Sequence, residues 1–182
     1  MLLCKDINVI FVAIPKTGTR SIYSVLRNQF ECQPLGEHRQ AIPAEYKDCF
    51  SFCVVRNPYD RICSNYWYRC HGEFDSWQCK DKFKKMCLDN TLENYLTVFE
   101  HKDSSWPQAR WILDNDINQI LRFETLEKDF NTLPFVKEYT KLPMLNVSGK
   151  PPWQEMVTAD IRKKINKIFE QDFKLLNYDM IE

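Results

Sequence analysis

The sequence predicts an α/β fold of three layers, in which a central parallel sheet is flanked by helices. Short apolar runs of strand length alternate with segments whose apolar residues recur at helical spacing. The chain has 182 residues, of which 44% are hydrophobic and 14% aromatic, so it can bury a substantial core. We therefore expect residues 1–182 to form a single domain.

The first strand and helix are predicted on either side of a small polar turn. "NVIFVAI" (8–14) is a continuous apolar run rich in Val and Ile, as expected of a strand that is buried on both faces. After Gly18, the apolar residues fall on one helical face: Ile22, Val25, Leu26 and Phe30. A strand, a turn and a helix therefore follow one another within 23 residues.

The same pattern recurs further along the chain. "FSFCVV" (50–55) predicts a second buried strand, and a helix follows through "YDRICSNYWYRC". "NQILRF" (118–123) predicts a third strand, followed by a helix through "LEKDFNTLPFVKEY". Thr158 is expected to cap a last helix with apolar residues at Ile161, Ile165, Ile168, Phe169 and Leu176. The charged and aromatic stretch 70–87 lacks a period, and we interpret it as an insertion near the rim of the site.

Charge balance disfavours several classes of partner. Lys plus Arg and Asp plus Glu number 25 each, whereas a general nucleic-acid or acidic-membrane binder usually carries a basic excess. "MLLCKDINVIFVAI" is too short to span a membrane and is interrupted by Lys5 and Asp6. We expect no nucleic-acid partner, no membrane insertion, and a cytoplasmic location in a bacterium or a virus-infected cell, unless the chain is a fragment of an anchored protein.

The eight cysteines leave their pairing open. An even number suggests disulfides in a secreted protein, but no secretory signal supports an oxidising compartment. Cys53 lies inside an apolar run, where a cysteine behaves as a small buried hydrophobe. Cys70, Cys79 and Cys87 are too widely spaced for a recognisable zinc pattern, even with His71 beside the first. We therefore expect no metal site.

The turn after the first strand is suited to an anion. The unpaired N–H groups and positive dipole end of the following helix attract phosphate-like groups, and Gly18 permits a close approach. Lys16 adds a charge, and hydroxyl donors come from Thr17, Thr19 and Ser21. The longer glycine-bounded loop of the Walker motif is absent. An ordinary capped turn is the structural alternative.

A second polar turn follows the second strand. Arg56 ends this strand, and its planar guanidinium group can donate two hydrogen bonds to a phosphate. Ser64 adds a hydroxyl from the next helix. The alternative is that Asn57 and Pro58 simply start that helix. Because the carboxyl ends of neighbouring parallel strands meet at one edge, the two turns predict a ligand with two separated anionic groups. A nucleotide phosphorylated at both ends of its ribose fits.

Four segments in this order resemble motifs of sulfotransferases that use 3′-phosphoadenosine-5′-phosphosulfate (PAPS), in particular the carbohydrate-type, family 2-like branch. "PKTGTRS" resembles their 5′-phosphosulfate loop, and "FCVVRNPYDRICSNY" their 3′-phosphate motif. "LRFETLEKDF" is similar to that branch's RFE-x-L-x-x-DF segment, and "LPMLNVSGKPPWQEMVT…FEQDFKLLNY" to its LP-x-LN-x-S loop and closing helix. The resemblance covers nearly the whole chain and implies a P-loop-like form of the three-layer fold.

The resemblance implies PAPS as co-substrate, no metal, and a specific set of binding residues. Those expected around the 5′-phosphosulfate are Lys16, Thr17, Gly18, Thr19, Arg20 and Ser21. Arg56 and Ser64 would hold the 3′-phosphate, and the loop Ser148, Gly149 and Lys150 would close over the nucleotide.

Two residues depart from the family pattern. Arg20 stands where a threonine is usual, so that it either pairs with a phosphate or points outward. Met144 stands where relatives often carry histidine, so that this position cannot transfer a proton.

Sulfuryl transfer resembles phosphoryl transfer, in which positioning and charge stabilisation do most of the catalysis. Lys16 is suited to the bridging oxygen, where charge develops, and simple phosphate binding is its alternative role. His38 in "HRQA" matches the branch's H-x-x-A/S and is the expected base, with Glu37 as local rival. The residues expected to line the acceptor site are Trp106, Gln108 and Arg110, although Trp106 could instead belong to the core.

These observations favour an enzyme that moves a sulfuryl group from PAPS to an acceptor hydroxyl, most simply on a carbohydrate. Two alternatives stay open. One is a P-loop-like kinase, which the missing Walker pattern disfavours. The other is a catalytically silent nucleotide-binding module, which Arg20 and Met144 leave open and which Lys16, Arg56 and Ser64 count against.

Overall fold

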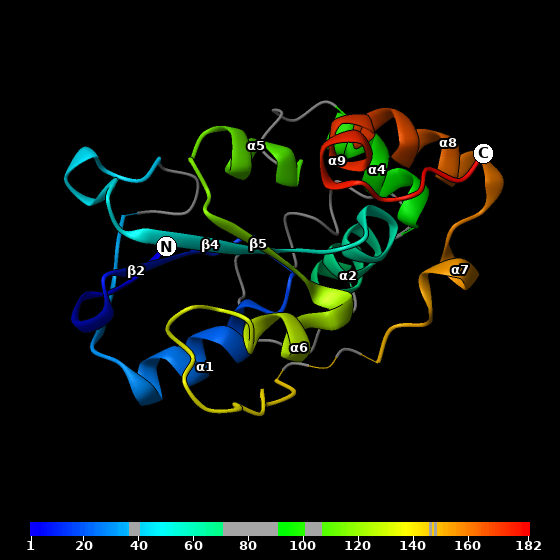
Figure 1. Ribbon diagram of the computed structural model, residues 1–182. Coiled ribbons are helices and arrows are strands. Elements are labelled where there is room, and N and C mark those ends of the chain that lie inside the picture. Colours follow the sequence, from blue (N-terminus) through cyan, green and yellow to red (C-terminus); the bar gives the residue numbers. More distant parts are fainter. Residues whose placement is uncertain (37–40, 71–90, 101–106, 146, 148) are drawn as a thin grey trace. The chain divides into compact units, whose positions relative to one another are not determined.

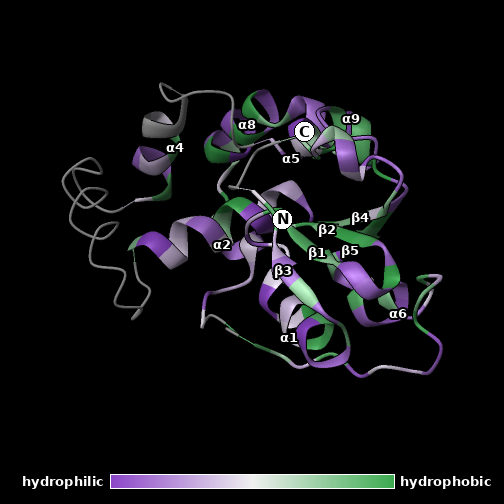
Figure 2. Cartoon of the chain, turned by 90° about the vertical axis from the view of Figure 1, so that its left-hand side faces the viewer, coloured by the Kyte–Doolittle hydropathy of each residue, from purple (hydrophilic) through white to green (hydrophobic). Residues whose placement is uncertain are grey.

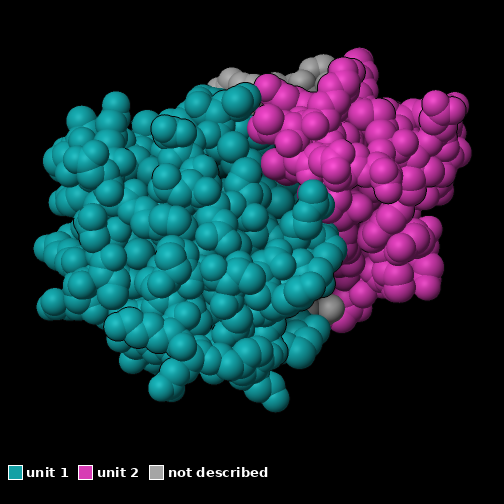
Figure 3. Space-filling model, in the orientation of Figure 1, with its two compact units in different colours: residues 1–56, 108–147 teal, residues 57–107, 148–182 magenta. Residues whose placement is uncertain are grey.

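The helices and strands separate into two units in the computed structural model (Figures 1 and 3). The structure describes all residues except 37–40, 71–90, 101–106, 146 and 148. Unit 1 comprises Met1–Arg56 and Gln108–Val147, and unit 2 comprises Asn57–Pro107 and Ser148–Glu182. The predicted insertion at 70–87 lies outside the described residues except for Cys70, which ends α2, and the single-domain organisation stays a prediction.

Unit 1 is built on a five-stranded mixed sheet with the strand order β3-β1-β2-β4-β5. Its strands are β1 (Leu2–Cys4), β2 (Val9–Val12), β3 (Cys32–Pro34), β4 (Phe50–Val55) and β5 (Gln119–Arg122). β2, β4 and β5 are parallel, as predicted, whereas β1 is antiparallel to both β2 and β3. The α/β class is confirmed, and the expectation of a wholly parallel sheet is wrong.

The sequence did not predict β1 and β3 because each has only three residues, too few to show a period. β1 reverses into β2 through a 3-10 turn, η1 (Lys5–Ile7), which ends at Asn8 in the left-handed conformation (φ 54°). Asn tolerates that conformation better than most residues. The charged pair Lys5 and Asp6, which interrupts the apolar run, therefore marks a hairpin.

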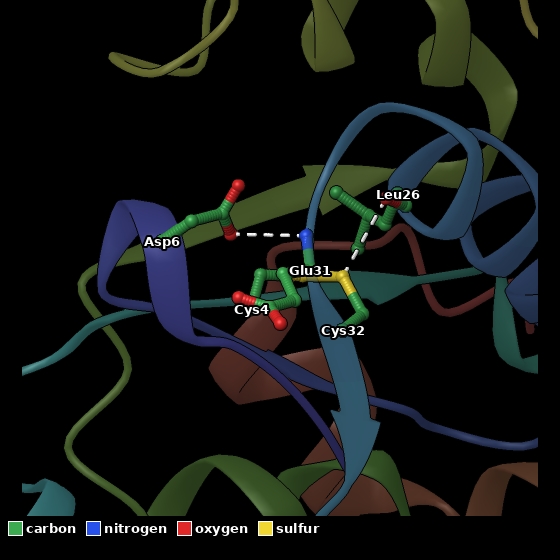
Figure 4. The surroundings of a disulfide bond; sticks show 5 residues. All are labelled: Cys4, Asp6, Leu26, Glu31 and Cys32. Atoms are coloured by element: carbon green, nitrogen blue, oxygen red, sulfur yellow. Dashed lines mark hydrogen bonds between the residues drawn. A yellow bond between two sulfur atoms is a disulfide. The ribbon is translucent and has the colours of Figure 1, made fainter.

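A disulfide between Cys4 and Cys32 joins β1 to β3, where the two residues lie opposite each other (Figure 4). Beside it, a carboxylate oxygen of Asp6 accepts the N–H of Glu31 at 3.1 Å. The structure thus pairs two of the cysteines whose state the sequence left open. Among the described cysteines, four others carry buried thiols: Cys49, Cys53, Cys63 and Cys70.

Helices lie on both faces of the unit 1 sheet (Figure 1). α1 (Thr19–Gln29) and α6 (Leu126–Phe130) lie on one face, and α5 (Gln108–Leu113) lies on the other. Short 3-10 turns occur at η2 (Ala44–Tyr46) and η3 (Phe123–Thr125). The long helix predicted through residue 139 is wrong, because α6 stops at Phe130 and Pro134 cannot continue it.

The core of unit 1 lies between the sheet and α1. In Figure 2 the strands are coloured mainly as hydrophobic, whereas α1 carries both colours. Phe11 of β2 stacks on Phe52 of β4, with ring centroids 5.0 Å apart. Of the residues predicted to share one helical face, Ile22, Val25 and Leu26 are buried, whereas Phe30, which follows α1, is partly buried. Burial also raises the pKa of the Cys53 thiol to about 12, which fits its interpretation as a buried hydrophobe.

Unit 2 is helical in the part that the structure describes. Its helices are α2 (Pro58–Cys70), α4 (Leu92–Glu100), α7 (Trp153–Met156), α8 (Ala159–Ile168) and α9 (Glu170–Leu176). They share a core that includes Tyr59, Ile62, Tyr95, Leu96, Ile165 and Phe173. None of the helices in the described residues is long and apolar enough to cross a membrane.

The predicted cap of the last helix is confirmed, because the Thr158 hydroxyl accepts the N–H of Ile161 at 3.4 Å. The single helix expected there is instead two, since the backbone leaves helical geometry at Phe169 (φ −110°, ψ 21°). Ile161, Ile165 and Phe169 are buried as expected.

Candidate functional site

The turn between β2 and α1 is shaped by its own threonines. The Thr17 hydroxyl donates to the carbonyl of Ile14 at 2.8 Å, and the Thr19 hydroxyl donates to the same oxygen at 2.9 Å. Thr17 is completely buried. Both hydroxyl hydrogens, which the sequence assigned to a ligand, are therefore used within the turn in this structure.

Lys16 and Gly18 both adopt left-handed backbone conformations, with φ of 70° and 82°. A Cβ at Gly18 would lie 2.9 Å from a methyl carbon of Leu126 and 3.2 Å from the Phe123 ring. Gly18 is therefore required by its conformation and by the close approach of the "RFETL" segment. Lys16 has a Cβ atom, so its left-handed conformation costs about 1–2 kcal/mol, which neighbouring contacts must offset.

The N-terminus of α1 has an electrostatic character that suits an anion. Gly18 is the N-cap and supplies no side-chain oxygen, and the first turn contains no acidic residue. Arg20 lies in this turn and is exposed, whereas Ser21 is buried. The positive end of the 11-residue helix is therefore not compensated by a carboxylate of its own first turn.

Arg56 lies one residue beyond β4 and contacts the first turn directly. Its guanidinium Nη1 donates to the carbonyl oxygen of Lys16 at 3.1 Å. The guanidinium carbon also lies 4.0 Å from the centroid of the Phe123 ring, in cation–π geometry. The structure therefore brings the Arg56 side chain to the backbone of Lys16, in keeping with the expectation that the two turns lie at neighbouring strand ends.

Phe123 was not among the residues predicted for the site, although it contacts both turns. One face of its ring packs against Arg56, and its ring carbons lie close to Gly18. Its position immediately after β5, inside the "LRFETLEKDF" segment, was the signal that could have identified it. Within unit 1, Phe123 of the third motif thus contacts Gly18 of the first motif and Arg56 of the second.

The start of α2 confirms the structural role of Asn57 and Pro58. The Asn57 side-chain oxygen accepts the N–H groups of Tyr59 at 3.0 Å and Asp60 at 3.4 Å, and Pro58 occupies the first helical position. Because Asn57 already caps this helix, anion binding near the "RNP" turn would depend on the Arg56 side chain.

Three predicted site residues lie in the described part of unit 2. Ser64 is buried in α2. The Lys150 ammonium donates to a carboxylate oxygen of Asp60 at 2.6 Å, with side chains only 10% and 20% exposed. Gly149 is exposed, and a Cβ there would meet nothing within 4 Å. The Lys150 charge is thus held by the first turn of α2, and its predicted contact with a nucleotide stays a prediction.

The residues predicted for catalysis and the acceptor are only partly described. Gln108 is completely buried, and Arg110 is half exposed and pairs with Asp114 at 3.3 Å. Met144 is 83% exposed. Four candidates lie outside the described residues: Glu37, His38, Trp106 and Ser148. Among the described residues, no cluster of three or more His, Cys, Asp or Glu side chains could hold a metal ion.

Comparison with known proteins identifies the family. The model of the family described as "Sulfotransferase family" matches residues 1–179, nearly the whole chain. Neither the curated proteins nor the solved structures contain a match to this chain. The matched region includes both anion-suited turns and the "RFETL" segment that packs between them. The chain therefore belongs to the sulfotransferase family, in its family 2-like branch.

Proposed function

We propose that this protein transfers a sulfuryl group from PAPS to a hydroxyl group of a carbohydrate. Sulfuryl transfer to a hydroxyl acceptor follows from family membership, whereas the donor, the sugar and the residue roles are our proposal. The observation that carries it is the contact between the Arg56 guanidinium and the Lys16 carbonyl, which brings two cationic residues to neighbouring strand ends. This arrangement supports binding of a nucleotide with 5′ and 3′ anionic groups in a P-loop-like fold.

In the proposed reaction, PAPS supplies the sulfuryl group, which passes in line to the acceptor oxygen as its bond to the 5′-phosphate oxygen breaks. Lys16 stabilises the negative charge that develops on that bridging oxygen. The N-terminus of α1, with its uncompensated dipole, binds the 5′-phosphate, and Arg56 binds the 3′-phosphate. His38 accepts the proton of the acceptor hydroxyl, with Glu37 as the alternative base.

Binding of the desulfated product tests the proposal. We expect 3′,5′-bisphosphoadenosine at a hundred times its dissociation constant to stabilise the protein by about 2.7 kcal/mol, independently of magnesium. The measurement is thermal unfolding with this ligand, ADP or 5′-AMP, each with and without magnesium, in the wild type and in Arg56→Ala. A shift with ADP alone would favour the kinase alternative. The absence of any shift would favour the silent nucleotide-binding module.

A further inference from the structure

We propose that Gln108 is a positioning residue, which fixes the backbone of Arg56 so that the guanidinium recognises the 3′-phosphate of the donor. This inference rests on the proposed function. It also replaces the acceptor contact that the sequence suggested for Gln108.

The carboxamide of Gln108 pairs with both backbone polar groups of one residue, Arg56. Its oxygen accepts the N–H of Arg56 at 2.9 Å, and its nitrogen donates to the carbonyl of Arg56 at 2.8 Å. The Gln108 side chain is completely buried. The two reciprocal bonds define which end of the carboxamide is oxygen and which is nitrogen, and they hold the backbone of Arg56 as a strand partner would.

Arg56 lies just beyond the paired residues of the sheet. The last residue pair in the register between β4 and β5 is Val55 with Arg122, one residue before Arg56. Gln108, the first residue of α5, provides hydrogen bonds to Arg56 directly after the last paired residue of β4. Without it, the N–H and C=O groups of Arg56 would lose hydrogen bonds in a partly buried place, which is costly.

The Arg56 side chain connects its own backbone to the turn between β2 and α1. Its contact with the Phe123 ring restricts the guanidinium plane, and its bond to the Lys16 carbonyl holds the strained left-handed residue (φ 70°). Gln108, Arg56 and Lys16 thus form a continuous chain of contacts within unit 1. Bidentate binding of phosphate depends on the orientation of the guanidinium group. Loss of the bonds between Gln108 and Arg56 should therefore weaken binding of the 3′-phosphate.

The test measures how much the 3′-phosphate contributes to affinity. We would determine by calorimetry the dissociation constants of 3′,5′-bisphosphoadenosine and of 5′-AMP, which lacks the 3′-phosphate, for the wild type and for Gln108→Met. Methionine matches glutamine in length but forms neither strong bond. The expected result is a loss of about tenfold or more in the preference for the bisphosphate, about 1.4 kcal/mol or more. With PAPS as substrate, KM should rise more than kcat falls.

Asn118→Ala is the matched control, because the Asn118 side-chain oxygen accepts the N–H of Ser51 at 2.7 Å near the other end of β4. This variant should lose stability but should still prefer 3′,5′-bisphosphoadenosine to 5′-AMP as strongly as the wild type does. Gln108→Glu is a second variant in case the methionine variant does not fold. It keeps an acceptor for the Arg56 N–H but loses the donor to the Arg56 carbonyl, so its preference should also fall.

Three outcomes would overturn the inference. If the wild type prefers the bisphosphate and the Gln108 variants keep that preference, Gln108 does not position Arg56. If Asn118→Ala loses the preference equally, Gln108 only stabilises β4 in general. If the wild type itself shows no preference for the bisphosphate, the proposed function fails, and this inference fails with it.

Discussion

At the scale of single residues, the turn between β2 and α1 is held by contacts that lie inside the protein. Thr17 and Thr19 bond to Ile14, and the Lys16 carbonyl accepts a hydrogen bond from Arg56. These contacts preorganise the backbone before any ligand arrives. Because the hydroxyl hydrogens of Thr17 and Thr19 are used internally, the proposed anion site would depend mainly on N–H groups and the Lys16 charge.

Replacement of Gly18 by alanine should destabilise the protein by about 2–4 kcal/mol, because left-handed strain and steric overlap with Leu126 add together. Urea unfolding would measure this loss. Gly149→Ala is the matched control and should be close to neutral, since a Cβ there meets no atom within 4 Å. Equal effects of the two substitutions would contradict this account of Gly18.

Replacement of Lys16 by methionine should lower kcat by roughly 10²–10³, the usual effect of removing one group that stabilises developing charge. The affinity for 3′,5′-bisphosphoadenosine, which contains no bridging oxygen to sulfur, should change much less. Single-turnover rates and calorimetry separate these quantities, and Lys47→Met, an exposed lysine of unit 1, serves as control. A large loss of affinity with little change in kcat would instead indicate a role in phosphate binding.

At the scale of elements, the antiparallel edge of the sheet depends on a covalent link. β3 has only three residues, and the Cys4–Cys32 disulfide closes a sequence separation of 28 residues to hold it against β1. Such a link stabilises a fold mainly by restricting the unfolded chain. A thiol at Cys32 would lie 3.5 Å from the Leu26 carbonyl and could donate to it, so reduction need not leave the sulfur without a contact.

Reduction of this disulfide should lower the free energy of unfolding by roughly 2–4 kcal/mol. Urea unfolding with and without a thiol reductant would measure the difference. In Cys32→Ser the effect of the reductant should be smaller than in the wild type, because the Cys4–Cys32 link cannot form and the thiols of the described chain form no other disulfide. A wild-type protein whose unfolding is unaffected by reductant would show that the link contributes nothing to stability.

At the scale of the whole molecule, membership of the sulfotransferase family covers residues 1–179 and therefore both units. The turn between β2 and α1, Arg56 and Gln108 belong to unit 1, whereas Asn57, Ser64 and Lys150 belong to unit 2. The cytoplasmic location expected from the sequence stays a prediction. A disulfide is more usual in an oxidising compartment, so the redox state of Cys4 and Cys32 in the native cell bears directly on that expectation.

The sequence by itself determined the features that depend on neighbouring residues. β2 and β4 follow from apolar runs, α1 and α2 from helical spacing after a turn, and the Thr158 cap from a single local bond. The positions of Lys16 and Arg56 at strand ends also followed, because parallel strands with helical connections place their carboxyl ends at one edge.

Only the tertiary structure decided the features that join distant residues. No local pattern in the sequence predicts three contacts of this kind. They are the disulfide between Cys4 and Cys32, the packing of Phe123 against Gly18 and Arg56, and the bonds from Gln108 to the backbone of Arg56, 52 residues away. Gln108 was expected to line the acceptor site, and its buried side chain bonds to the N–H and C=O of Arg56, just beyond the end of the β4–β5 pairing. The need for such a partner arises only after the sheet has formed.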